Sequence, residues 1–313
     1  MLANAPDMHQ ANNQNAEFAT SSELLAASRS VIVSGATSQI GKFLLPRLVD
    51  AGCGVVALSR QAAPGWKAEQ SKNIRWLRVN IRDNAALSAL PSAHSLIHLA
   101  PLTILPKEIE TFSELGLKRI IAFSSSSKHS KARSPIATER VYAQHLDTAE
   151  GVLADRCREF GIHWTIFRPT LIYGRDMDRN ISLIRRLVKA VGIFPILGEA
   201  SGLRQPVHAD DLAQACVAAL HNPVTFEKTY DLSGGETLTY RAMVERIFES
   251  LNYKPRFMPI PQSLFSAIIG ILSFIPRYRD FNIAMAQRMN ENLVYEHTEA
   301  TRDFGYQPRY FSP

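Results

Sequence analysis

Hydrophobic residues fall into short, mostly β-branched runs along the first half of the chain, at residues 31–33, 55–58, 74–79, 96–99, 120–123 and 164–167. Segments long enough for helices, such as 40–50 and 138–160, separate most of these runs. Apolar strands that alternate with helices are typical of a parallel sheet whose two faces are both covered. Because crossovers between parallel strands are right-handed, the pattern predicts a doubly wound α/β fold.

This regularity weakens after residue 175, where helical segments follow one another. We expect helices near 181–191, 210–221, 241–251, 264–275 and 282–292, and a last short helix that Thr298 caps and Gly305 ends. We therefore predict a first domain at 29–175, to which 204–235 return, and a smaller, mostly helical C-terminal substrate subdomain from 176–203 and 236–313. Residues 1–28 are polar and contain no Lys or Arg, so we interpret them as a disordered extension rather than a signal peptide.

A glycine-containing turn joins the first strand to the first helix and reads Ser34-Gly35-Ala36-Thr37-Ser38-Gln39-Ile40-Gly41. Gly35 permits a tight turn, and Gly41 lets the helix pack closely on the strand. Ser38 stands where close approach to a pyrophosphate usually demands glycine. The amides and the positive dipole end of the helix would face phosphate, which predicts a Rossmann dinucleotide site formed by Gly35, Thr37, Ser38, Gln39, Ile40 and Gly41.

The second strand ends in Ser59 and Arg60, where a carboxylate would be expected to accept the ribose hydroxyl of NAD. A hydroxyl and a guanidinium favour a phosphate instead. We therefore predict NADP as the cofactor, with NAD as the alternative, in which case Arg60 simply points to solvent.

Composition narrows the remaining classes of protein. The chain is 46% hydrophobic and 20% charged, which is ordinary for a soluble domain, and its net charge of +6 includes no compact Lys/Arg run, which argues against nucleic acid as a partner. Cys53, Cys157 and Cys216 lie too far apart for a zinc or redox motif, so we expect no metal site and a cytoplasmic location. Residues 264–275 are apolar and too few to span a bilayer. We interpret them as a helix that packs on the core or on a partner subunit, or as a peripheral contact with the inner face of a membrane.

The turn at 34–41, together with 96–101, 123–127, 167–174 and 204–211, resembles the extended short-chain dehydrogenase/reductase superfamily, in its NAD-dependent epimerase/dehydratase branch. The resemblance implies hydride transfer on a nucleotide-linked sugar. It also implies that Asn80 and Ile81 flank the adenine, that Ala100 and Pro169 line the cofactor cleft, and that Ser126 hydrogen-bonds the reacting oxygen. The substrate-binding residues that it implies are Asn180, Arg204 and Arg288. For Arg204, a salt bridge at the domain interface is the structural alternative.

Acid–base chemistry in this family rests on a Tyr-x-x-x-Lys motif. Tyr142 stands at the tyrosine position, but Leu146 stands at the lysine position. A free tyrosine titrates near 10 and is a poor base at neutral pH without help. Either Tyr142 is still the acid/base, assisted by His145, Lys128 or Lys131, or it is an ordinary helix residue in an atypical member of the family.

Two functional hypotheses remain open at this point. The first is an NAD(P)-dependent epimerase, dehydratase or reductase whose partner is a nucleotide-sugar-like small molecule, and which we also consider as a homodimer. The second is a non-catalytic or weakly catalytic NADP(H)-binding sensor or assembly protein on the same scaffold, which Leu146 and Ser38 favour.

Overall fold

The computed structural model describes residues 29–61, 72–175, 177, 178, 180–261 and 287–313. The extension expected at 1–28 and the apolar segment at 264–275 lie outside the described residues. In the part of the chain that is described, no helix is both long and apolar enough to cross a bilayer.

Seven parallel strands form the central sheet, in the order β11-β6-β5-β4-β1-β2-β3. The strands are β1 Ser30–Ser34, β2 Gly54–Ser59, β3 Ile74–Arg78, β4 Ser95–His98, β5 Arg119–Phe123, β6 His163–Pro169 and β11 Lys228–Leu232. The doubly wound parallel sheet predicted from the hydrophobic pattern is therefore confirmed. β11 was not predicted as a strand, because it lies at the sheet edge and mixes polar with apolar residues.

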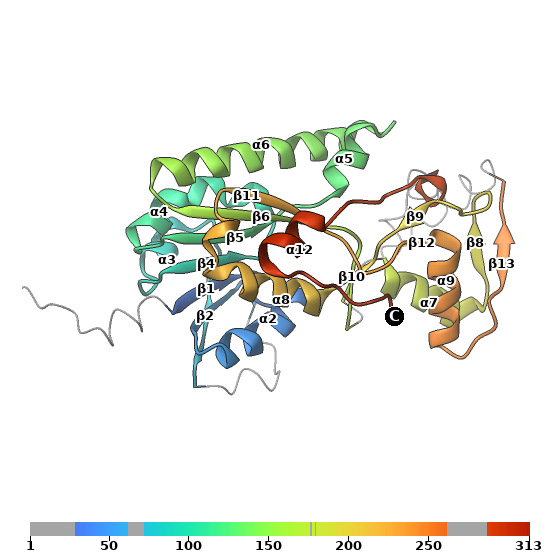
Figure 1. Cartoon of the computed structure of the whole chain (residues 1–313), viewed down its shortest axis with the longest axis horizontal. Coiled ribbons are helices and arrows are strands. Elements are labelled where there is room, and N and C mark those ends of the chain that lie inside the picture. Colours follow the sequence, from blue (N-terminus) through green and yellow to red (C-terminus); the bar gives the residue numbers. More distant parts are fainter. Residues whose placement is uncertain (1–28, 62–71, 176, 179, 262–286) are drawn as a thin grey trace, which may run out of the picture.

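Helices cover both faces of this sheet (Figure 1). On one face α2 Gln39–Asp50 and α8 Ala209–Leu220 close one hydrophobic cluster. On the other face α3 Asn84–Ser88, α4 Ile109–Glu114 and the long α6 Ala137–Glu159 close a second. Short helical turns connect these elements at η2 Leu102–Ile104, η3 Pro106–Glu108, α5 Ser127–Ala132 and η4 Pro223–Thr225.

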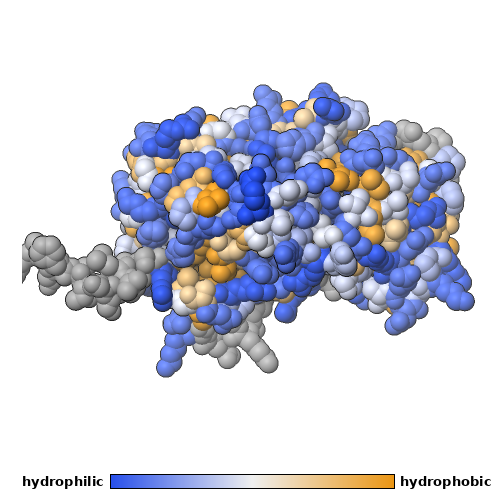
Figure 2. Space-filling view, in the orientation of Figure 1, coloured by the Kyte–Doolittle hydropathy of each residue, from blue (hydrophilic) through white to orange (hydrophobic). Residues whose placement is uncertain are grey.

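A second lobe lies beside the carboxyl ends of the strands, at the right of Figure 1, around a third hydrophobic cluster. It contains α7 Ile181–Val191, α9 Tyr240–Ser250 and η6 Arg288–Asn290, with the strand pairs β8 Phe194–Ile196 with β13 Phe257–Pro259 and β9 Leu203–Arg204 with β12 Leu238–Thr239. A further pair, β7 Ile172–Tyr173 with β10 Val207–His208, lies between the sheet and the lobe (Figure 1). The face shown in Figure 2 is mainly hydrophilic, with hydrophobic residues gathered in small separate patches. Among the described residues, most of the buried apolar side chains belong to the three clusters.

The last helix, α12 Thr298–Phe304, corrects one expectation. Thr298 is its first helical residue and not its cap; His297 precedes it without a side-chain capping bond. Gly305 ends the helix with φ +71°, as expected for a left-handed terminal residue.

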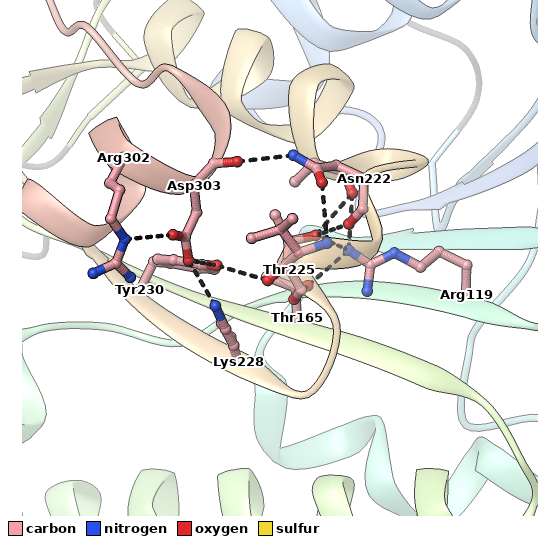
Figure 3. A network of polar contacts seen from close by, with 10 residues as sticks. Arg119, Thr165, Asn222, Thr225, Lys228, Tyr230, Arg302 and Asp303 are labelled. Atoms are coloured by element: carbon pink, nitrogen blue, oxygen red, sulfur yellow. Dashed lines mark hydrogen bonds and ion pairs between the residues drawn. The ribbon is translucent and has the colours of Figure 1, made fainter.

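Arg119 anchors the carboxyl end of α8 to the sheet (Figure 3). Its side chain is 1% exposed, and its guanidinium donates to the carbonyls of Leu220 at 3.1 Å and Ala219 at 3.0 Å. It also donates to the hydroxyls of Thr165 at 2.7 Å and Thr225 at 3.0 Å. A cation at the negative end of a helix dipole is favourable. This bond set holds the carboxyl end of α8 against the sheet.

Candidate functional site

The phosphate turn is pressed against the end of β4. Gly35 has φ +67°, and a Cβ built on it would lie 2.8 Å from the Ala100 nitrogen and 2.9 Å from the Leu99 carbonyl carbon. A Cβ on Gly41 would lie 2.1 Å from the Ala36 carbonyl oxygen. Neither position therefore accepts a side chain without moving backbone, which is the close packing that the sequence motif predicts.

Ser38, which replaces a glycine of the usual motif, caps α2. Its Oγ accepts a hydrogen bond from the Gly41 nitrogen at 3.2 Å. Thr37 and Gln39 are partly exposed beside it, whereas Ile40 is buried in the cluster under α2. The first-turn amides of α2 and its positive dipole end thus lie at the carboxyl end of β1, where a phosphate would be stabilised.

His98, at the end of β4, forms hydrogen bonds next to this turn. The sequence pattern did not single it out as a functional residue. Its Nδ1 lies 2.7 Å from the Ser34 Oγ, and its Nε2 lies 3.2 Å from the Pro101 carbonyl oxygen. A carbonyl only accepts, so Nε2 carries the hydrogen and Nδ1 accepts from the serine hydroxyl. Burial lowers the pKa of His98 to about 4, so the ring is neutral in this role.

The side-chain oxygen of Gln39 indicates that the residues present fit a bound dinucleotide. Its Oε1 is buried and has no hydrogen-bond partner among the described residues, and its side chain lines a cavity in front of α2. An orphaned acceptor of this kind costs free energy unless a donor reaches it. The hydroxyls of a ribose or the amide of a nicotinamide are donors of the right kind, so the residues fit the cofactor.

The edge of the sheet beyond β2 carries two guanidinium groups. Ser59 is buried, and its Oγ accepts from the Gln61 nitrogen at 3.1 Å, while Arg60 is exposed. Arg78, at the end of β3, is in register with Ser59 and donates from Nε to the Arg60 carbonyl at 3.3 Å. Sequence reasoning missed Arg78, because strand register is what brings it to this edge.

The residues expected at the adenine lie just beyond β3. Asn80 is exposed, and its Oδ1 accepts from the Arg82 nitrogen at 3.3 Å, whereas Ile81 is buried in the adjoining cluster. Their assignment to the adenine stays a prediction.

One cavity of about 600 Å³ lies between the sheet and the second lobe. Its lining includes residues that the sequence predicts for cofactor, chemistry and substrate, namely Gln39, Ser126, Tyr142, Asn180, Arg204 and Arg288. These residues come from segments up to 250 positions apart, and the fold brings them to one space. The described residues hold no group of three or more His, Cys, Asp or Glu side chains placed to bind a metal.

Ser126 and Tyr142 supply the hydroxyls of the cavity. Ser126 is buried, and its Oγ donates to the Pro169 carbonyl at 3.0 Å, so its lone pairs are what it can offer to a substrate hydroxyl. Tyr142 is 44% exposed on α6, and burial of the rest raises its pKa. Leu146, one turn further along, is 4% exposed in the cluster between α6 and the sheet.

The three proposed helpers of Tyr142 lie in different places. His145 is exposed on α6. The Lys128 Nζ lies 2.7 Å from the Asp147 Oδ1 and 2.7 Å from the Glu150 Oε2. Lys131 lines the cavity, and its Nζ lies 4.5 Å from the centre of the Tyr142 ring. Lys131 is therefore the helper that the fold brings to the tyrosine.

Glu150 explains why Lys128 is held away. Its carboxylate accepts from the Ser124 Oγ at 2.5 Å and from the Arg168 Nε at 3.0 Å, in addition to the Lys128 ammonium. Burial acts to raise the pKa of Glu150, but the hydrogen bonds from Arg168, Lys128 and Ser124 hold it below its usual value. This ion cluster joins β5, β6, α5 and α6 next to the cavity.

The two arginines that line the cavity, Arg204 and Arg288, differ in whether a carboxylate balances their charge. The buried guanidinium of Arg204 donates to the backbone carbonyls of Leu203 and Glu291, each at 2.7 Å, and to that of Arg288. Within the described part of the chain, no carboxylate lies at ion-pair distance from Arg204, so the salt-bridge alternative is wrong there. Burial lowers its pKa to about 10. Arg288 instead forms a two-point pair with Glu139, at 2.7 and 3.0 Å.

A model of the NAD dependent epimerase/dehydratase family matches residues 31–111 and 108–233. An uncharacterized protein of Sinorhizobium fredii is 23% identical over 90% of this chain and 75% of its own length. The dTDP-4-dehydro-6-deoxy-D-allose reductase of a Streptomyces species is 27% identical over 62% of this chain and 73% of its own. The UDP-glucuronic acid 4-epimerase of Bacillus cereus, solved with UDP-glucuronic acid and NAD, superposes with a TM-score of 0.66 at 16% identity, over 90% of this chain and 95% of that one. The chain therefore belongs to the NAD dependent epimerase/dehydratase family.

Proposed function

We propose that this protein is an NAD(P)-dependent oxidoreductase of the epimerase/dehydratase type that acts on a nucleotide-linked sugar. The observation that carries the proposal is the cavity of about 600 Å³ that joins Gln39 at the amino end of α2, the hydroxyls of Ser126 and Tyr142, and the buried guanidinium of Arg204. A sensor or assembly protein would need the cofactor turn but no second anion site.

The glycine turn and the amino end of α2 would hold the pyrophosphate of the cofactor, and the Gln39 Oε1 would accept from a ribose hydroxyl or from the nicotinamide amide. When bound, the nicotinamide supplies or accepts a hydride. The hydroxyls of Ser126 and Tyr142 would contact the oxygen of the sugar carbon that reacts.

Arg204 would bind the diphosphate of the substrate. A buried cation without a carboxylate partner is costly, and an anionic ligand that enters the cavity offsets this cost. Arginine also binds phosphate oxygens in two-point geometry, which fixes the direction in which the sugar points. Support comes from the B. cereus epimerase, which was solved with a UDP-linked sugar acid.

NADP is the form of the cofactor that we propose. Arg60 and Arg78 bring two cations to the end of β2, and no carboxylate follows this strand directly. Charge-assisted bonds to a ribose phosphate are worth more than the neutral contacts that NAD would make there.

The test is turnover of UDP- and dTDP-linked sugars by the purified chain with NADP or NAD, followed by chromatography of the sugar products. We expect at least one sugar to be epimerised, dehydrated or reduced, and NADPH to bind more tightly than NADH. Ser126→Ala and Tyr142→Phe each remove a hydroxyl that would hydrogen-bond the reacting oxygen, so each should slow product formation about 100-fold without weakening NADPH binding. Cofactor binding with no sugar converted would contradict the proposal.

Substrate binding is tested by calorimetry with UDP alone. Arg204→Gln should weaken UDP at least about tenfold, because a charge-assisted pair is lost, and leave NADPH binding unchanged. Arg256→Gln, at an exposed position of the same lobe, is the matched control and should change neither. Equal UDP affinity in the Arg204 variant would remove the arginine from the substrate site.

A further inference from the structure

Lys131 is a cavity cation that the proposed function leaves without a role. It lies on the short helix α5, partly buried, with its Nζ 4.5 Å above the centre of the Tyr142 ring. Both side chains line the cavity together with Ser126. Among the described residues, no carboxylate lies at ion-pair distance from Lys131, in contrast to Lys128, which has two.

The charged groups that face Lys131 are Glu139 on α6 and Arg288 on η6. The Glu139 carboxylate is occupied by Arg288 and by the Ser134 Oγ at 2.6 Å. The cluster of Lys131, Glu139 and Arg288 therefore keeps one unbalanced positive charge.

This environment makes the amine the easier of the two groups to deprotonate. Burial lowers the pKa of Lys131, Glu139 opposes this effect and Arg288 adds to it. Burial acts in the opposite direction on the neighbouring phenol and raises the pKa of Tyr142. Because both groups lie in one cavity, they titrate as a coupled pair, in which burial favours the neutral amine and the protonated phenol.

We propose that Lys131 is the general acid–base residue of this site and that Tyr142 holds it through the face of its ring. This inference rests on the proposed function. In the proton step, the O–H bond of the substrate breaks and an N–H bond forms at the Lys131 Nζ, so that a neutral amine becomes an ammonium ion. The reverse step returns the proton, and neither direction changes an oxidation state. The lysine therefore comes from α5. It does not come from α6, where Leu146 stands at the motif's lysine position and is packed into the core.

The first experiment needs no substrate. The full chain is acetylated with acetic anhydride over a range of pH, and the modification of each lysine is followed by mass spectrometry, with exposed Lys107 as the internal reference. We expect the midpoint of Lys131 to lie below that of Lys107, because burial lowers the pKa of Lys131. A midpoint equal to or above that of Lys107 would overturn the proposal.

The second experiment separates proton exchange from charge. Lys131→Met and Lys131→Arg should both lose about 100-fold or more in kcat, because arginine keeps the charge but does not release a proton at working pH. NADPH affinity and the melting temperature should match those of the unaltered protein, and Lys107→Met should retain full activity. Full activity in Lys131→Arg would refute the acid–base role.

The two proposals fail in different ways. If the unaltered protein converts no nucleotide sugar, the proposed function is wrong, while the acetylation midpoint still decides whether Lys131 is a proton-exchanging amine. If sugars are converted and Lys131→Met is as active as the unaltered protein, only the inference about Lys131 is wrong.

Discussion

At the scale of single residues, burial of a basic group does two different jobs in this protein. His98 is fully enclosed and stays neutral, which lets it join Ser34 to the Pro101 carbonyl beneath the phosphate turn. Lys131 is only partly buried and faces the cavity. Its lowered pKa favours the neutral amine, which is the form that can accept a proton from a ligand. Burial thus gives His98 a structural role and Lys131 a proposed chemical one, because only Lys131 faces a space that a ligand can enter.

His98 predicts a loss of stability in mild acid. Its folded pKa is about 4 against an ordinary value of 6.5, so its contribution is complete above pH 6.5 and is lost as the pH falls from 6.5 to 4. Between about pH 7.5 and pH 5 the free energy of unfolding should fall by about 2 kcal/mol from this group alone. Urea unfolding measures it.

Two variants isolate this effect. His98→Asn should lower stability at neutral pH and remove about 2 kcal/mol of the acid dependence. His145→Gln, at an exposed position of α6, should change neither quantity. An unchanged pH dependence in the His98 variant would show that the ring does not stay neutral.

Two glycines offer a matched pair of substitutions. Gly41→Ala places a methyl group 2.1 Å from the Ala36 carbonyl, so α2 must move and NADPH binding should weaken at least about tenfold. Gly151→Ala, inside α6, meets nothing within 4 Å and should stabilise the protein by about 1 kcal/mol. Thermal unfolding and NADPH titration measure both, and tight NADPH binding by Gly41→Ala would contradict the packing argument.

At the scale of elements, polar contacts fix α8 at its two ends and α6 near its middle. His208 caps the amino end of α8 by accepting from the Asp210 nitrogen at 3.1 Å, and Arg119 satisfies carbonyls at its other end. α6 is fixed through Glu150 to three neighbours. Hydrophobic pattern alone predicts where such helices lie, but these contacts fix each helix against its neighbours.

Arg119 predicts a large loss of stability when it is shortened. Arg119→Met removes the donor to the Leu220 carbonyl and to two threonine hydroxyls inside the core, so the free energy of unfolding should fall by about 3 kcal/mol. Arg158→Met, whose pair with Asp155 is exposed on both sides, should change it by less than about 0.5 kcal/mol. Denaturant titration decides, and equal effects of the two variants would contradict the argument.

At the scale of the whole molecule, the last residues tie the sheet to the second lobe. Figure 1 shows the chain ending between the two. Tyr306 is buried in the cluster under the sheet, and Phe311 is buried in the cluster of the lobe. Between them Arg309 donates to Asp211 at 2.7 Å and to Asp210 at 2.8 Å. The cavity lies between the two parts that this segment connects.

Phe311 and its neighbour Tyr310 test this connection. Phe311 is 4% exposed and Tyr310 is 73% exposed. Phe311→Ala should therefore cost about 3 kcal/mol of stability, whereas Tyr310→Ala should cost less than about 0.5 kcal/mol. Thermal unfolding and UDP binding are the measurements, and a Phe311 variant as stable as the Tyr310 variant would show that the segment does not join the parts.

Local chemistry let the sequence by itself determine the strands of the sheet apart from β11, the turn at Gly35 and Gly41, and the membership of the family. Runs of apolar residues, a required positive φ and a helix amino end are properties of neighbouring residues, so they are visible in one stretch of chain. The tertiary structure decided what depends on distant segments. It placed Lys131, and not Lys128 or His145, against Tyr142, and it brought Arg78 beside Arg60 by strand register. It also neutralised Arg288 with Glu139 while it left Arg204 without a carboxylate among the described residues. A cation can bind a ligand only where no carboxylate packs beside it. That pairing depends on residues far apart in the sequence, so no local pattern predicts it.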